Sequence, residues 1–225
     1  MGIVLRWFSA LVLLALVAAP AAGQELKSDE QKTLYALGLI LSQNLTAFNL
    51  SAADLEVVKA GMTDGVLKKE PKVELPTWGP KIQELQTARL ASIAAAEKKT
   101  GEAFLVKAAA EKGATKTASG LIITTLKPGT GASPKASDKV KVHYVGTLAD
   151  GTVFDSSVQR NEPITLPLTG GIIKCWTEGV PLMKVGGKSR LVCPSDLAYG
   201  DQGRPPRIKP GATLVFEIEL LEIAK

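Results

Sequence analysis

Five aromatic side chains in the second half of the sequence could build an apolar binding pocket. Aromatic residues make up only 5% of the chain. Those that concern us fall after residue 140, at Tyr144, Phe154, Trp176, Tyr199 and Phe216. A pocket walled by rings and supplied with a few polar groups would suit a small apolar ring such as that of a proline residue. The alternative is that all five are ordinary core residues.

One charged pair, Asp155 and Arg160, follows Phe154 directly and could supply polar groups to such a pocket. Other chemistry has little support. His143 is the only histidine, and the sequence has no nucleophile elbow of the form G-x-S-x-G. Two cysteines and one histidine cannot supply a closed zinc site without carboxylates. The segment 200–203 lacks the Lys-Ser/Thr of a phosphate-binding loop. We therefore expect no cofactor and no metal.

Length and composition indicate an ordinary globular protein. The 225 residues leave room for one large domain or two small ones. The hydrophobic share of 45% is enough to bury a core, which excludes disorder of the whole chain. The net charge of +5 is modest and does not coincide with clustered aromatics, so we expect no nucleic acid partner.

Residues 1–23 resemble a secretory signal peptide. Arg6 makes a short positive region, residues 11–19 are apolar, and small residues follow at 21–23. The alternative is a membrane anchor, but the apolar run is shorter than the roughly 20 residues that span a bilayer. No cysteine lies near the cleavage region for lipid attachment. We expect an exported protein without a stable membrane anchor, in the periplasm of a Gram-negative bacterium or, alternatively, on the outer-membrane surface.

Export changes the interpretation of the two cysteines, Cys175 and Cys193. In an oxidising compartment two thiols tend to pair. A bridge between them would close a loop of about 18 residues and add roughly 3 kcal/mol to the free energy of unfolding. The alternative is two buried, unpaired thiols. The spacing is not that of a C-x-x-C redox motif.

The first half of the exported chain has helical patterns. Ser28 and Gln31 have the spacing of a capping box. Leucines recur behind them at helical spacing, at Leu34, Leu37, Leu41 and Leu45. A second helix is predicted to start at Ser51, with Asp54 three positions on. A third, of about 50 Å, is predicted from Pro80 to Lys112, exposed over much of its length.

Three such helices cannot bury their apolar stripes in about 90 residues. We expect that a second copy of the chain covers them, which would make the protein a homodimer through these N-terminal helices. The alternative is that the helices fold back on the second half of the chain.

The second half has strand patterns. Residues 113–119 are small and polar and mark a boundary. In the last strand, Leu214, Phe216, Ile218 and Leu220 alternate with Val215 and two glutamates, which predicts one buried and one largely wet face. We expect an antiparallel sheet wrapped on one short helix, preceded by an all-α arm, so the fold class is α+β. The predicted strands are 121–126, 140–145, 164–168, 189–193 and 213–221, and the helix is about 175–183.

Five ordered blocks of the second half resemble an FKBP-type peptidyl-prolyl isomerase domain, over residues 117–225. They are VKVHYVGTL (140–148), DGTVFDSS (150–157), WTEG (176–179), PSDLAYG (194–200) and PGATLVFEIEL (210–220). Tyr35-Ala36-Leu37-Gly38 and the long helix are similar to the dimerising arm of the FkpA/Mip (macrophage infectivity potentiator) branch. The resemblance implies a helical dimerisation domain at 24–79, a connecting helix at 80–113 and an isomerase domain at 114–225.

The resemblance also implies roles for individual residues. Trp176 would form the pocket floor, Asp155 the carboxylate that faces the substrate, and Tyr199 the hydroxyl that donates to a carbonyl. Arg160 would lie near Asp155, and Ile208 on a hydrophobic flap. Ile164 stands where an aromatic is often found, and the segment 204–207 is more basic than is usual. The remaining pocket walls would be Tyr144, Phe154, Ile172, Ile173 and Phe216.

The implied reaction is rotation about the peptide bond before proline, on unfolded or proline-containing polypeptides, with chaperone activity from a dimeric arm. It needs no nucleophile, because an apolar pocket disfavours the charge-separated resonance form of the amide and so eases its twisting. Macrolides are the inhibitors that the family implies. The alternative function is a non-catalytic chaperone or peptide-binding module that uses a cleft between the two copies.

Overall fold

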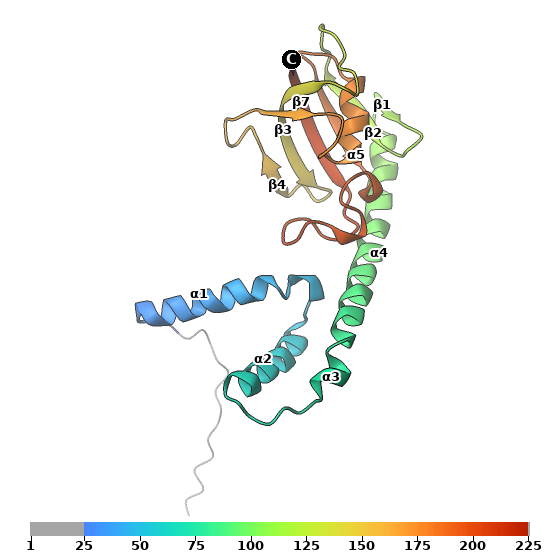
Figure 1. Cartoon of the computed structure of the whole chain (residues 1–225). Coiled ribbons are helices and arrows are strands. Elements are labelled where there is room, and N and C mark those ends of the chain that lie inside the picture. Colours follow the sequence, from blue (N-terminus) through green and yellow to red (C-terminus); the bar gives the residue numbers. More distant parts are fainter. Residues whose placement is uncertain (1–24, 225) are drawn as a thin grey trace, which may run out of the picture. The chain divides into compact units, whose positions relative to one another are not determined.

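The computed structural model describes residues 25–224, and within them the predicted α+β class is confirmed (Figure 1). The described residues divide into two compact units, 25–41 and 42–224. The sheet and the long helix both belong to the second unit. The expected signal peptide, residues 1–23, lies outside the described residues.

The first helices begin where the capping patterns predict. Helix α1 (Asp29–Gln43) follows a capping box in which the Gln31 amide donates to Ser28 Oγ at 3.1 Å. Helix α2 (Ala52–Val66) follows a second box, made by Ser51 and Asp54. One expectation is wrong: α1 ends at Gln43, so Leu45 does not continue its leucine stripe but precedes the 3₁₀ turn η1 (Thr46–Phe48).

The long helix α4 (Lys81–Ala109) follows the short helix α3 (Leu75–Trp78) and ends three residues before the predicted Lys112. Most of its side chains are exposed, as expected. Its buried residues are Ala94, Gly101 and Ala108, which are seven positions apart and therefore share one face. A Cβ on Gly101 would lie 2.3 Å from Thr213 Oγ1, so this face packs closely against the second half of the chain. The alternative of a helix that folds back thus holds for this part of α4.

A seven-stranded antiparallel sheet forms the second half of the described residues, in the order β1-β2-β6-β7-β3-β4, with β5 also paired to β3. Strands β1 and β4 were not among the predicted ones, because each is short and bounded by turn residues. The strands are β1 (Ala114–Lys116), β2 (Ile122–Lys127), β3 (Lys139–Leu148), β4 (Val153–Ser156), β5 (Ile164–Pro167), β6 (Lys188–Cys193) and β7 (Leu214–Ala224).

Helices cover both faces of this sheet. Helix α5 (Lys174–Gly179), continued by the 3₁₀ turn η2 (Val180–Leu182), packs on the face that carries the alternating buried residues of β7. The alternation along β7 predicts that the other face of the sheet is largely wet, and this prediction is wrong. Val215 is buried there with Ile122 and Val192, because Ala108 and Phe104 of α4 cover them. Burial of this second face is what holds α4 to the sheet.

Cys175 at the start of α5 and Cys193 at the end of β6 form a disulfide, with 5.8 Å between their Cα atoms. Of the two alternatives that the sequence leaves open, the structure therefore has the bonded one. The bond ties the helix that carries Trp176 to a central strand of the sheet.

No helix within residues 25–224 combines the length and the apolar character that a membrane-spanning helix needs.

Candidate active site

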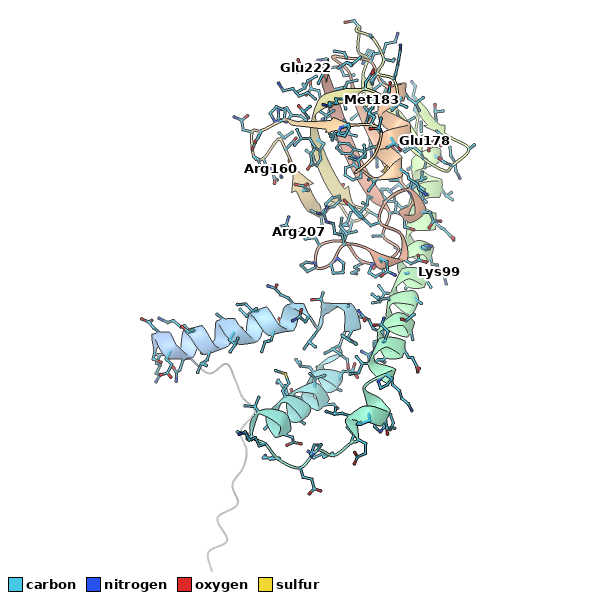
Figure 2. The ribbon with its side chains drawn as sticks, in the orientation of Figure 1. Lys99, Arg160, Glu178, Met183, Arg207 and Glu222 are labelled. Carbon is cyan, nitrogen blue, oxygen red and sulfur yellow. A yellow bond between two sulfur atoms is a disulfide. The ribbon has the colours of Figure 1, made fainter. Side chains whose placement is uncertain are left out.

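Two cavities flank Phe154 and Asp155 on β4. The first, of about 300 Å³, opens beside Tyr199, and the second, of about 570 Å³, opens beside Arg160. Figure 2 shows Arg160 and Arg207 on the same side of the sheet, around β4. The first cavity is lined by Phe154, Asp155, Tyr199 and residues 204–208. The second is lined by residues 152–156, Gln159, Arg160, Pro206 and Arg207.

The strand register brings the site residues of three strands together. Gly146 on β3 lies opposite Asp155 on β4 and opposite Phe216 on β7. A Cβ at Gly146 would lie 2.7 Å from Phe154 Cζ and 3.0 Å from Phe216 Cε1. The absence of a side chain at this position therefore lets the two rings meet edge to face, with their centroids 5.7 Å apart.

Trp176, Tyr144 and Phe216 form a layer of rings behind the first cavity. The Trp176 ring contacts Tyr144 and Phe216 edge to face, at centroid distances of 5.1 and 5.3 Å. Trp176 is only 5% exposed and lines neither of the two cavities, whereas Phe154 lines both. The rings thus converge as expected, but in this structure Phe154 and Tyr199, and not Trp176, present the surface that a ligand would meet first.

Asp155 accepts hydrogen bonds from two side chains. The Tyr144 hydroxyl donates to Oδ2, and Arg160 Nη1 donates to Oδ1 at 2.5 Å. Burial alone would raise the pKa of Asp155, but the bond from Tyr144 and the charge of Arg160 outweigh it, so this pKa lies below its usual value. Burial and the neighbouring carboxylate raise the pKa of Tyr144. Asp155 is therefore a carboxylate and Tyr144 a neutral donor at neutral pH.

Helix α4 supports the loop that carries Tyr199. Lys98 lies 3.1 Å from Asp196 in the 3₁₀ turn η3 (Ser195–Leu197) and 2.7 Å from Asp201 in η4 (Gly200–Gln202). Glu97 pairs with Lys209 at 2.9 Å, at the end of the same loop. Two successive residues of α4 thus bracket the segment that positions the Tyr199 hydroxyl.

The remaining residues expected at the site lie around it. Ile172 and Ile173, which precede α5, and Ile164 on β5 are half-buried and pack against the core cluster that contains Trp176 and Phe216. None of these three isoleucines lines either cavity. Ile208, the expected flap residue, does line the first cavity. His143 lies outside both cavities and pairs with Ser157, Nδ1 to Oγ at 3.0 Å.

Sequence reasoning missed eight lining residues: Thr152, Val153, Ser156, Gln159, Arg204, Pro205, Pro206 and Arg207. The unusual basic character of the segment 204–207 was the signal that could have found four of them. Arg207 Nη1 donates to the backbone carbonyl of Phe154 at 3.1 Å, which joins the flap to β4. Within residues 25–224, no three histidine, cysteine or acidic side chains gather as metal ligands would.

The lowered pKa of Asp155 predicts how activity responds to pH. We expect kcat/KM for a proline peptide to be flat between about pH 5 and 8, because Asp155 stays ionised throughout. The stability that this carboxylate contributes is fully present above its ordinary pKa of 3.8 and is lost as the pH falls through the lower folded value. A bell-shaped profile with an acid limb that disappears in Asp155→Asn would contradict the expectation.

Comparison with known proteins points to one family. Residues 131–221 match the family model for FKBP-type peptidyl-prolyl cis-trans isomerase, and residues 30–123 match the domain amino terminal to it. The chain is 44% identical to FkpA of Aeromonas hydrophila over 92% of its own length and 81% of that protein. It is 39% identical to an FKBP-type 22 kDa isomerase of Escherichia coli, over 86% and 95%. The crystal structure of E. coli FkpA superposes with a TM-score of 0.66 at 36% identity, over 88% of this chain and 97% of that one.

Proposed function

Because this chain belongs to the FKBP-type peptidyl-prolyl cis-trans isomerase family, we propose that the cavity between Phe154 and Tyr199 is the active site. There the chain rotates the peptide bond that precedes proline in polypeptide substrates. The observation that carries this assignment is the composition of the cavity. Two rings and Ile208 border a space of about 300 Å³, with one ionised carboxylate, Asp155, at its edge. We propose that the proline ring packs against these apolar walls, with Trp176 and Phe216 supporting them from behind.

The geometry performs this reaction without a nucleophile or a proton transfer. Rotation about the amide bond has a barrier of about 18–20 kcal/mol, which comes from resonance between nitrogen and carbonyl. An apolar pocket disfavours the charge-separated resonance form, and fixed dipoles favour the twisted amide. Tyr199 Oη accepts a hydrogen bond from Arg204 Nη1 at 3.3 Å, so its own proton is available to the substrate carbonyl. Asp155, held by Tyr144 and Arg160, supplies a fixed negative charge.

An isomerisation assay on a Leu-Pro peptide tests the assignment. The full chain should accelerate cis-to-trans conversion far above the uncatalysed rate, which is slow, on the order of tens of seconds or more. Tyr199→Phe should lower kcat/KM about tenfold, since one hydrogen bond to the carbonyl is lost. Tyr35→Phe, in α1, is the matched control and should not change the rate. A wild-type chain that does not exceed the uncatalysed rate would overturn the proposal.

We propose further that the arm at residues 24–79 makes the chain a homodimer, with 80–113 as connecting helix and 114–225 as isomerase domain. The support is apolar surface on α1: Leu34, Leu37 and Ile40 are 51–61% exposed, and soluble monomers rarely expose such a run. Chaperone activity of the arm toward unfolded polypeptides would use the same surface.

Light scattering measures the mass that this proposal predicts. The wild-type chain should have twice the monomer mass, and Leu37→Asp should halve it, because a buried charge opposes association. Lys32→Asp, on a charged position of the same helix, should leave the mass unchanged. A monomeric wild-type chain would refute the dimer, and with it the cleft on which the non-catalytic alternative depends.

The proposed location is the periplasm, reached through the signal peptide at 1–23, with the outer-membrane surface as the alternative. The Cys175–Cys193 disulfide supports an oxidising compartment. Macrolides are proposed inhibitors because they would compete for the cavity between Phe154 and Tyr199. Cell fractionation with N-terminal sequencing of the recovered chain would test the location.

A further inference from the structure

Positive charge exceeds negative charge at the rim of the two cavities. Their lining contains three guanidinium groups, of Arg160, Arg204 and Arg207, but only one carboxylate, of Asp155. Arg160 is paired with that carboxylate at 2.5 Å. Two of the three positive charges, on Arg204 and Arg207, therefore have no ion-pair partner in the lining.

Neither of these two arginines forms a close ion pair with an acidic side chain within the described part of the chain, and the charge of Asp155 acts on Arg204 only at longer range. Arg204 donates to the Tyr199 hydroxyl at 3.3 Å, and Arg207 to the backbone carbonyl of Phe154 at 3.1 Å. Each bond uses one of the five N–H donors of a guanidinium, and both residues are exposed. By contrast, the neighbouring Lys209 is paired with Glu97 at 2.9 Å. In the segment 204–209, Lys209 is thus neutralised by Glu97 of α4, whereas Arg204 and Arg207 face the cavities and can interact with a ligand there.

We propose that Arg204 and Arg207 bind a carboxylate side chain of the substrate, so that the isomerase prefers polypeptides with Asp or Glu within two residues of the proline. This rests on the proposed function, because the proline ring must lie between Phe154 and Tyr199. Both arginines contact one of those two residues directly. One or two residues of extended chain span about 3.5–7 Å, a distance that a glutamate side chain and an arginine can bridge. A planar guanidinium is suited to hold such a carboxylate with two parallel bonds.

Matched peptides that differ only at the residue beside Leu-Pro test the preference, with Glu, Gln or Lys placed before Leu or after Pro. At low ionic strength kcat/KM for the Glu peptide should exceed that for the Gln peptide about three- to fivefold, in at least one of the two positions. The Lys peptide should fall below the Gln peptide. The Glu/Gln ratio should approach one in about 1 M salt, where the screening length is about 3 Å.

The Arg204→Gln/Arg207→Gln double variant should reduce the Glu/Gln ratio to about one, and this ratio, not the absolute rate, is the readout. Lys116→Gln/Lys127→Gln removes the same charge from exposed positions of β1 and β2, at the other end of the sheet from β4, and should keep the wild-type ratio. A wild-type ratio of one, a ratio that survives in the arginine variant, or a ratio that is lost in the lysine variant would each overturn the inference. Failure of the proposed function itself is distinguishable, because the Gln peptide would then not be isomerised.

Discussion

Replacing Asp155 by asparagine is expected to lower kcat/KM for a proline peptide about 30-fold, which corresponds to about 2 kcal/mol of transition-state stabilisation. Asparagine has nearly the same shape and can still accept a bond from the Tyr144 hydroxyl. It lacks the negative charge, and it leaves the Arg160 guanidinium uncompensated beside the cavity. Because the loss is electrostatic, it should appear mainly in kcat and not in KM.

Asp150→Asn is the matched control. Asp150 is an exposed carboxylate in the turn between β3 and β4, where it accepts from the Thr152 amide at 2.9 Å, and it lines neither of the two cavities described. The kcat/KM of the Asp150→Asn variant should stay within about twofold of the wild-type value. If Asp155→Asn also stays within this range and unfolds at the wild-type temperature, Asp155 has no part in the reaction.

Removal of the disulfide, by Cys175→Ala/Cys193→Ala, is expected to lower the free energy of unfolding by about 3 kcal/mol and the melting temperature by about 10 °C. The two cysteines are 18 positions apart, and both are fully buried. The cross-link restricts the unfolded chain, and without it the α5 helix is held to β6 by packing alone.

Thermal unfolding followed by circular dichroism, with and without dithiothreitol, separates this effect from a simple loss of packing. Reductant should lower the melting temperature of the wild-type chain toward that of the variant and should leave the variant unchanged. A wild-type chain that melts at the same temperature under both conditions, although its thiols are shown to be free, would mean that the bond contributes nothing to stability.

The sequence predicted the class of the fold, because the class depends on strong local signals. Alternation along β7 identified Phe216 and Leu220 as core. Through the family resemblance, the motif blocks predicted Tyr144, Phe154 and Tyr199 as walls of one pocket; Phe154 and Tyr199 line the first cavity, whereas Tyr144 lines neither cavity. The sequence did not predict that Trp176 lies behind the surface of the cavities. That depends on the edge-to-face packing of three rings, which no local pattern encodes.

The long helix shows a second limit of sequence reasoning. The fully buried residues of its contact face are Ala94, Gly101 and Ala108, and such small residues do not form a recognisable apolar stripe. The sequence therefore predicts exposure of much of the helix but not its contact with the sheet, and it predicts that the sheet face with Val215 is largely wet. The close approach that makes these residues suitable depends on Thr213 and Gly211, more than a hundred positions away.

Helix α4 is attached to the domain by ion pairs as well as by the apolar contact of Phe104 and Ala108 with the sheet. Glu97 of α4 pairs with Lys209, and Lys98 of α4 pairs with Asp196 and Asp201. Glu111, two residues beyond the end of α4, pairs with Arg190. Attraction between such solvent-accessible groups weakens as dissolved ions accumulate around them. We therefore expect rising ionic strength to weaken the ion pairs along α4, which lie next to the loop that holds Tyr199.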